Sequence, residues 1–366
     1  MSNKDFPGRG TAANPPNRYE PLHIELDPAD EAGDFGDETE GAGGERATVP
    51  RTPTLYYRDA SRSILAENQS PDLRFRFSLN PYRGCEHGCS YCYARPSHEY
   101  LGFSAGLDFE RRLLVKENAP ELLRETFQSP RWKPEIVALS GNTDCYQPIE
   151  RRLQITRRCL EVFVEFRNPV SVITKSALVA RDADLLAELA RVGAGAAFVS
   201  ITTLEPELAR RMEPRTASPE RRLEAIATLA AAGVPVGVMV APVIPGLNDA
   251  EIPRIIQAAA AAGARSASWV LLRLPKPVDD LFTGWLDEHY PERRSRILGH
   301  IRDTRAGRLS DTRFGRRMRG QGEYAAQIAA LFATAARKHG LDVALPALRS
   351  DAFRRPPSRG DQLSLL

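Results

Sequence analysis

Three of the five cysteines in this 366-residue chain lie within eight consecutive residues. Cys85, Cys89 and Cys92 have the spacing C-x3-C-x2-C and follow a strand-like run and a turn signal at 79–82. One loop can therefore direct three thiolates at a common centre, as in the binding of an iron–sulfur cluster. A closed cluster or a structural zinc site takes four protein ligands, so three cysteines imply either a distant fourth ligand or an open metal position.

The rest of the composition favours a soluble cytoplasmic protein. The chain is 42% apolar, with no apolar stretch of the roughly 20 residues that a membrane span needs and no apolar signal core at its start. An odd number of cysteines, most of them crowded together, argues against a disulfide framework and for metal in a reducing compartment. We therefore expect a cytoplasmic location and no membrane partner.

Beyond the cysteine loop the sequence repeats one pattern, a short apolar run followed by an amphipathic stretch. With the strand-like run that precedes the loop, the pattern predicts six βα units, whose apolar runs are 73–79, 136–139, 170–173, 196–201, 236–240 and 267–272. Parallel strands joined by helical crossovers give such a sequence. A partial barrel and a doubly wound sheet fit it equally well, and in both the ligands bind at the carboxyl ends of the strands.

The segment 83–93, Arg-Gly-Cys-Glu-His-Gly-Cys-Ser-Tyr-Cys-Tyr, resembles the C-x3-C-x-aromatic-C loop of the radical S-adenosylmethionine (radical SAM) superfamily, in particular its spore photoproduct lyase-like branch. The resemblance implies an α/β fold, a partial (β/α)6 TIM-like barrel over residues 54–277. A helical, arginine-rich extension over 278–345 and a flexible tail over 346–366 would follow. The three cysteines would hold a [4Fe–4S] cluster whose fourth iron binds SAM.

The same resemblance implies a reaction. Reductive cleavage of SAM would give a 5′-deoxyadenosyl radical that abstracts hydrogen from a substrate, and nucleic acid is one candidate substrate. Flavodoxin or ferredoxin would supply the electron. The competing interpretation is a nucleic-acid-binding protein without catalysis, in which zinc or a cluster is held by the three cysteines with His87 or His98.

Polar residues at the ends of the second and third predicted strands are candidates for SAM binding. Gly141, Asn142 and Asp144 stand where the superfamily has the loop that binds the SAM amino group, although the letters differ. Thr174 and Lys175 follow the next strand and can meet the ribose hydroxyls and the carboxylate. A polar turn in the first case and a surface lysine in the second are the alternatives.

The remaining SAM candidates come from the cysteine loop and the later strands. Tyr91 offers an aromatic face beside the last cysteine, and Ser200 and Thr202 end the fourth strand. Arg215 resembles an arginine that reaches the SAM carboxylate, and Val243 stands where the superfamily packs on adenine. For Arg215 the alternative is a residue that merely precedes a helix cap.

Two further residues near the strand ends could act on substrate. Arg273 follows the sixth strand, where it either faces substrate or lies on the surface. Cys145 lies on the loop after the second strand, where a hydrogen-donor role is one hypothesis. Cys159, within a helical stretch, is expected to be an ordinary buried residue.

Charge is segregated along the chain. Residues 1–53 are predicted to be disordered, because the stretch 20–45 holds ten acidic residues and no Lys or Arg; an acidic strand covering a basic groove is the alternative. Residues 291–320 hold ten arginines against three acids, which favours either phosphate contacts with nucleic acid or a solvated helical cover. Gln362–Leu366 resembles the peptide by which bacterial repair proteins bind the sliding clamp.

Overall fold

The computed structural model describes residues 8–19 and 53–357. Its main sheet has seven strands in the order β10-β9-β8-β7-β6-β3-β2. β2 is antiparallel to β3, and every other neighbouring pair is parallel. The strand bounds are Leu65–Glu67 (β2), Phe77–Leu79 (β3), Val137–Leu139 (β6), Val170–Thr174 (β7), Gly195–Ser200 (β8), Val236–Val243 (β9) and Ser266–Leu271 (β10).

The parallel strands follow one another across the sheet in chain order. A doubly wound sheet reverses its strand order at a switch point, whereas a barrel adds each strand beside the one before it. The partial (β/α)6 barrel is therefore confirmed, and the doubly wound alternative is wrong. Apolar residues on both faces fit this arrangement, since the consecutive residues Val137, Ala138 and Leu139 of β6 are all fully buried.

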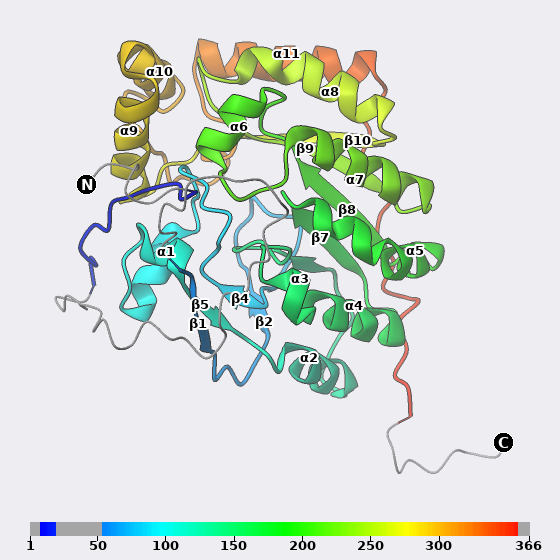
Figure 1. Ribbon diagram of the computed structural model, residues 1–366. Coiled ribbons are helices and arrows are strands. Elements are labelled where there is room, and N and C mark those ends of the chain that lie inside the picture. Colours follow the sequence, from blue (N-terminus) through cyan, green and yellow to red (C-terminus); the bar gives the residue numbers. More distant parts are fainter. Residues whose placement is uncertain (1–7, 20–52, 358–366) are drawn as a thin grey trace, which may run out of the picture.

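Helices cover the outer side of the sheet, and Figure 1 shows α4, α5, α7 and α8 following one another along it. Their apolar faces have helical spacing; Phe163 and Phe166 of α4 both pack on Phe127 of α2. The helix bounds are Asp108–Arg111 (α1), Ala119–Gln128 (α2), Glu150–Leu153 (α3), Ile155–Phe166 (α4), Ala183–Arg191 (α5), Pro206–Met212 (α6), Pro219–Ala231 (α7) and Ile252–Ala261 (α8), with short 3-10 turns at Arg95–Leu101, Ala177–Asp182 and Asp249–Glu251.

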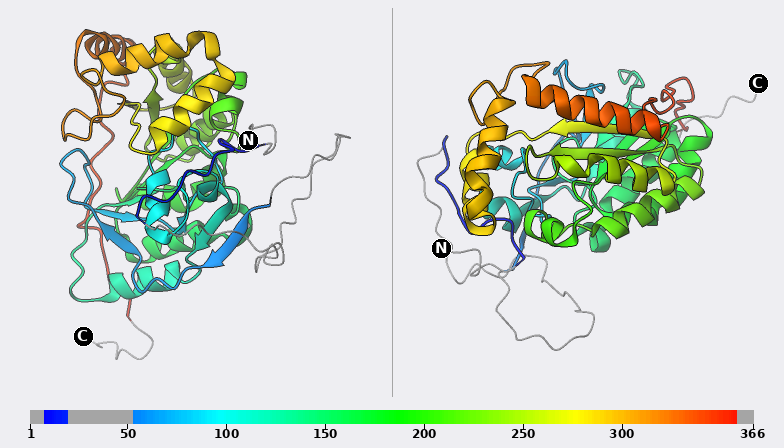
Figure 2. Two further views of the ribbon diagram at one scale, coloured as in Figure 1. Left: turned by 90° about the vertical axis from the view of Figure 1, so that its left-hand side faces the viewer. Right: turned by 90° about the horizontal axis from the view of Figure 1, so that it is seen from above.

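The C-terminal extension is helical, as expected. It comprises α9 (Val278–His289), α10 (Pro291–Asp303) and α11 (Glu323–Lys338). In Figures 1 and 2, α9 and α10 lie at one end of the molecule, and α11 lies beside α8. Within the described residues, no helix combines the length and apolarity that crossing a membrane requires.

A second, three-stranded sheet supports the cysteine loop. Its order is β1-β5-β4, with β1 at Leu55–Arg58, β5 at Arg112–Val115 and β4 at Tyr82–Arg83. β4 ends two residues before Cys85, so this small sheet fixes where the loop begins. β5 pairs with β1 on one side and with β4 on the other.

Part of the N-terminal segment is ordered, so the prediction of disorder throughout 1–53 is wrong for residues 8–19. Arg9 donates to the Glu110 carbonyl oxygen and to the Thr54 hydroxyl, both at 2.8 Å. Asn17 donates to the Glu99 carbonyl oxygen at 2.8 Å. Specific polar contacts thus order a segment that has little apolar area to bury. The acidic stretch 20–45 lies outside the described residues.

The segment 304–322 bridges the two sides of the open barrel. On one side, the Leu271 amide of β10 donates to the Met318 carbonyl oxygen at 2.9 Å. On the other side, Asp72, which lies between β2 and β3, accepts from the Gly315 amide at 2.7 Å and from Arg317 Nε at 2.5 Å. A loop far along the chain therefore fills the gap that six strands leave in the barrel.

A buried histidine makes stability depend on pH. His98 is fully buried, with its ring centroid 5.3 Å from that of Phe103 and 5.6 Å from that of Phe109. Burial lowers the pKa of His98 from 6.5 to about 4. As the pH falls, His98 takes up a proton in the unfolded chain at a higher pH than in the folded chain. The contribution of neutral His98 to folding stability is therefore complete above pH 6.5 and is lost as the pH falls through 4.

We therefore expect wild type to lose about 2 kcal/mol more stability between pH 7 and pH 5 than His98→Phe, whose ring fills the same site without titrating. Urea denaturation of both proteins at the two pH values measures the difference. If both lose stability equally over this range, His98 is not the group responsible.

Candidate functional site

A cavity of about 430 Å3 opens at the carboxyl ends of the parallel strands. All three cysteines of the loop, Cys85, Cys89 and Cys92, line it. The opposite walls are formed by residues at or just after the ends of β6, β7, β8, β9 and β10. This is where α/β barrels bind their ligands, so the fold delivers the thiols to the expected place.

Tight backbone contacts hold the cysteine loop in shape. The Cys85 amide donates to the Phe109 carbonyl oxygen at 2.8 Å, and the Ser90 amide donates to the Met212 carbonyl oxygen at 3.0 Å. Gly88 has a φ of 65°, and a Cβ there would lie 2.6 Å from a Glu110 carboxylate oxygen. A side chain at this position would therefore force the loop away from its support.

A buried ion pair holds the loop from behind. Arg95 and Glu110 are both fully buried and form an ion pair at 2.5 Å. Arg95 also donates twice to the Cys89 carbonyl oxygen, at 3.1 and 2.9 Å. The Gly10 amide donates to Glu110 at 2.9 Å, and a Cβ at Gly10 would lie 1.5 Å from the Gly88 carbonyl oxygen. The ordered N-terminal segment thus lies directly against the loop.

The three thiols suit a metal cluster better than free thiolate chemistry. Burial raises the pKa of Cys85, Cys89 and Cys92. They therefore stay protonated at neutral pH unless a metal cation replaces the protons. Within the described part of the chain, no group of three or more His, Cys, Asp or Glu side chains is already drawn around a common metal position. Three soft donors on one cavity wall nevertheless match the ligand set of an iron–sulfur cluster.

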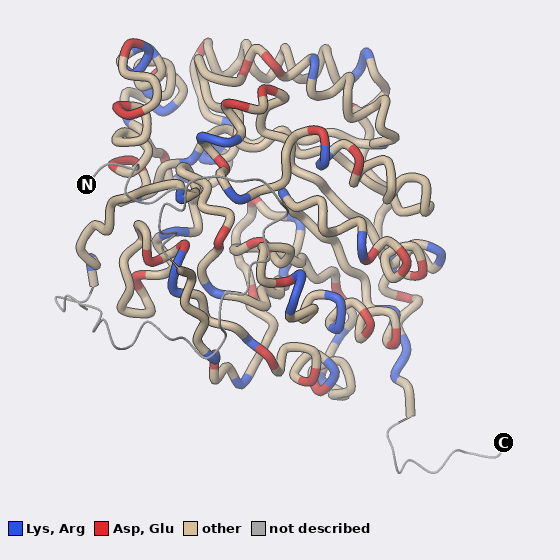
Figure 3. The backbone as a smooth tube through the Cα atoms, viewed as in Figure 1, with Lys and Arg blue, Asp and Glu red and all other residues tan. Residues whose placement is uncertain are grey.

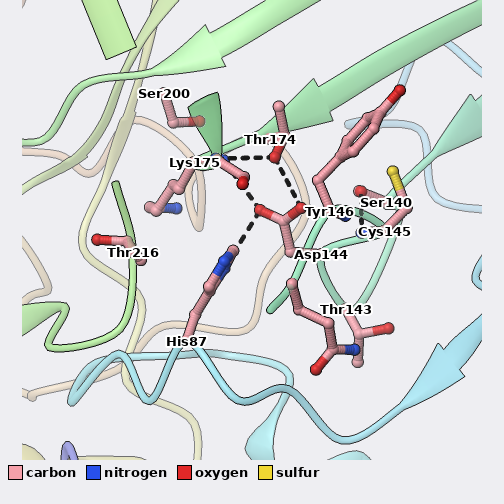
Figure 4. Close-up of polar contacts among 12 residues, drawn as sticks. His87, Ser140, Thr143, Asp144, Cys145, Tyr146, Thr174, Lys175, Ser200 and Thr216 are labelled. Carbon is pink, nitrogen blue, oxygen red and sulfur yellow. Dashed lines mark hydrogen bonds and ion pairs between the residues drawn. The ribbon is translucent and has the colours of Figure 1, made fainter. Parts of the chain in front are cut away.

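Asp144 connects the cysteine loop to β7 (Figure 4). Its carboxylate accepts from the Thr174 hydroxyl at 2.7 Å and from the Lys175 amide at 2.9 Å, and it lies 3.4 Å from His87 Nδ1. Burial alone would oppose ionisation, but His87 and these hydrogen bonds lower the pKa of Asp144 to about 2. The carboxylate is therefore fully occupied within the protein.

Lys175 places a cation beside the cysteines. Its Nζ lies 5.9 Å from the centre of the Tyr91 ring. Burial lowers the pKa of Lys175, but the nearby Cys89 and Glu213 outweigh burial and raise it. Glu213 is already bound by Arg222, by Thr202 and by the Tyr91 hydroxyl. Lys175 is thus a charged group on the cavity wall next to Cys89.

Most of the predicted SAM contacts line this cavity. Besides the three cysteines, these are Tyr91, Gly141, Asn142, Asp144, Thr174, Lys175 and Ser200. Arg273, predicted to face either substrate or the surface, lines it as well. The surface-lysine alternative is therefore wrong for Lys175, although Ser176 does cap the following turn by accepting from the Leu178 amide at 3.3 Å.

Three predicted contacts do not line the cavity. Thr202 is fully buried and donates to Glu213 at 2.6 Å. Val243 is also fully buried, in the hydrophobic core. Arg215 forms an ion pair with Glu86 at 3.1 Å. Each of these residues is used by a buried partner that the linear sequence does not show, and their contact with SAM stays a prediction.

The other candidate ligands and donors lie elsewhere. His98 packs between two phenylalanine rings away from the cavity, whereas His87 lines it and contacts Asp144. Cys145 is fully buried and does not line the cavity, so the structure gives no support to a hydrogen-donor role. Cys159 is fully buried in α4, as expected.

Sequence reasoning missed several lining residues, chiefly Asn68, Ser70, Tyr93, Met239, Pro242, Arg317 and Met318. Tyr93 could have been found from its place directly after the last cysteine.

Of the arginine-rich segment 291–320, Arg317 and Met318 reach the cavity, while α10 packs on α9. Figure 3 shows acidic and basic positions intermixed over the outer helices. The clamp-like peptide Gln362–Leu366 lies outside the described residues.

Comparison with known proteins finds a matching family model, sequence relatives and similar solved structures. The family model described as "Radical SAM superfamily" matches residues 79–259. An uncharacterized protein of Mycobacterium tuberculosis is 40% identical over 226 residues, which are 61% of this chain and 66% of that protein. An uncharacterized protein of Methanocaldococcus jannaschii is 31% identical over 176 residues, 48% of this chain and 63% of that protein. The matches thus span slightly less than two thirds of these relatives.

The similar solved structures include spore photoproduct lyase complexed with dinucleoside spore photoproduct. The TM-score is 0.55 at 15% sequence identity, and the superposition covers 78% of this chain and 79% of the lyase. At an identity this low, the structural similarity shows that the two proteins share a fold. A shared barrel fold agrees with the sequential strand order of the sheet.

Proposed function

Because the chain belongs to the radical SAM superfamily, we propose that it is an enzyme that cleaves SAM reductively and abstracts hydrogen from a nucleic-acid substrate. The observation that carries the proposal is the meeting of the three loop cysteines with the strand ends in one cavity. A cluster held by Cys85, Cys89 and Cys92 supplies, when bound, the electron for SAM cleavage.

The protein's own residues position and seal the reactants. Lys175 offers a cation to a carboxylate placed next to Cys89, and the ordered strand ends provide hydroxyl and backbone groups around it. Asp144 links the cysteine loop to β7, which fixes the distance between these two walls of the cavity. The segment 304–322 closes the side of the barrel and excludes water from the cavity, which protects a reactive species.

Nucleic acid as the substrate is supported by charge. Arg273 and Arg317 line the cavity, and Arg317 belongs to the arginine-rich segment 291–320. The structurally similar lyase is seen with a dinucleoside bound. Flavodoxin or ferredoxin as electron donor, and sliding-clamp binding through Gln362–Leu366, stay predictions.

Anaerobic reconstitution tests the proposal. The full chain, supplied with iron and sulfide and reduced with dithionite, should turn brown and form 5′-deoxyadenosine and methionine from SAM, both quantified by chromatography. A colourless protein that retains one zinc ion and leaves SAM intact would instead support the non-catalytic zinc interpretation.

Replacing Lys175 by methionine should weaken SAM binding while preserving the iron content. Loss of a charge-assisted contact of about 1.5–3 kcal/mol predicts a KM for SAM raised on the order of ten- to hundredfold. The measurement is the initial rate of 5′-deoxyadenosine formation against SAM concentration. The matched control is Lys338→Met, an exposed residue at the end of α11, which should behave as wild type. An unchanged KM in Lys175→Met would remove this residue from the SAM site.

A further inference from the structure

Within the described residues, no carboxylate forms an ion pair with Arg273, a cation at the cavity wall. It follows β10 by two residues and lines the cavity. Its guanidinium lies 4.9 Å from the centre of the Tyr93 ring and donates to the Met318 sulfur at 3.7 Å. Among residues 8–19 and 53–357, no Asp or Glu lies within ion-pair distance of it.

This lack of a partner distinguishes Arg273 from Arg317, the other arginine in the cavity lining. Arg317 also lines the cavity, but it is paired with Asp72. Burial, the largest effect, lowers the pKa of Arg273; Tyr93 and Asp72 raise it, and the charge of Arg317 lowers it. A partly buried arginine beside a second arginine is costly unless an anion arrives to offset the charge. The site is therefore suited to a negatively charged ligand.

The surroundings indicate what kind of anion fits. Phe314 is 58% exposed, and the Arg317 guanidinium lies 4.6 Å from the centre of its ring. Tyr93, beside Arg273, is 45% exposed. Cations interleaved with accessible aromatic rings are the pattern of single-stranded nucleic-acid binding, in which bases stack and arginines contact phosphates.

The size of the cavity restricts how such a ligand can enter. A volume of about 430 Å3 is that of a small-molecule pocket. The proposed cluster and SAM would take part of this volume, so a polymer can insert no more than a single unit while the rest of the strand remains outside, as enzymes that act on nucleic-acid bases require. Arg273 and the segment 304–322 border the space that the strand would follow.

We propose that Arg273 binds a phosphate of a single nucleic-acid strand, next to the nucleotide that enters the cavity. This inference rests on the proposed function, because it identifies how the same cavity takes its substrate. It also assigns the phosphate contact to a residue outside the arginine-rich segment 291–320. The planar guanidinium suits a phosphate because two parallel N–H groups can face two oxygens.

Fluorescence anisotropy with a labelled 12-nucleotide single strand, as DNA and as RNA of the same sequence, tests the proposal on the anaerobically reconstituted full chain. Arg273→Gln should raise the Kd on the order of ten- to hundredfold, and reduce the slope of log K against log salt by about 0.7. The matched control is Arg296→Gln, which removes an equal charge from an exposed position on α10. It should change the Kd by no more than about threefold.

Arg273→Lys separates geometry from charge, because it keeps the cation but not the planar fork. It should bind the strand more tightly than Arg273→Gln and less tightly than wild type. Comparison of the DNA and RNA arms shows which nucleic acid is preferred.

Three results would overturn the inference: equal weakening by Arg273→Gln and Arg296→Gln, no weakening by Arg273→Gln, or equally tight wild-type binding of poly-glutamate. Formation of 5′-deoxyadenosine by the same wild-type preparation, without oligonucleotide, tests the proposed function separately. SAM cleavage without strand binding would refute this inference alone, and strand binding without SAM cleavage would refute the enzymatic proposal.

Discussion

Replacing Cys89 by alanine is expected to reduce 5′-deoxyadenosine formation to the level of a protein-free control. Cys89 lines the cavity with the two other loop cysteines, and two thiols would not supply the three protein ligands that the proposed cluster needs. Iron content, the absorbance band near 400 nm and the rate of SAM cleavage, measured after anaerobic reconstitution, should all fall together. Cys85→Ala and Cys92→Ala should give the same result.

Cys159→Ala is the matched control, because it removes a thiol that is fully buried in α4 away from the cavity. It should retain iron and the rate of SAM cleavage, with a modest loss of stability from the small cavity left behind. A Cys89→Ala protein that keeps a full complement of iron and cleaves SAM at the wild-type rate would disprove the ligand assignment.

Glu110→Gln is expected to destabilise the apo protein by about 3–5 kcal/mol, because it leaves the Arg95 charge buried without its partner. Both side chains are fully buried, and Glu110 also accepts from the Gly10 amide. The free energy of unfolding in urea measures the effect. Since Arg95 holds the Cys89 carbonyl oxygen, the variant should also lose iron faster than wild type when a chelator is added.

The control for this change is Glu207→Gln on α6, which removes the same charge from an exposed pair with Arg210 and Arg211. It should leave the urea midpoint unchanged. The double variant Arg95→Met, Glu110→Leu should recover much of the lost stability, because it removes both charges rather than one. A single variant as stable as wild type would show that the pair does not hold the loop.

The resemblance to a superfamily predicted that the cysteine loop lies at the carboxyl ends of the barrel strands, and the structure places it there, while individual side-chain positions were harder to predict. Asp144 and Lys175 were predicted from their positions after strands, and both line the cavity. Arg215 was predicted from its resemblance to an arginine that reaches the SAM carboxylate, yet it pairs with Glu86. A strand end specifies the edge at which a side chain lies. It does not specify whether that side chain forms an ion pair with a buried carboxylate elsewhere in the fold instead of contacting a ligand.

By itself the sequence determined the grouping of three thiols in one loop and the number of βα units. Both depend on local spacing: three thiols within eight residues, and apolar runs of strand length separated by helical stretches. Tertiary structure alone decided the sequential strand order, the loop that brings Met318 against β10, and the contact of Gly10 with Gly88. These features join residues that are tens to hundreds of positions apart. Such pairings are chosen by packing and charge compensation over the whole fold, which no local pattern records.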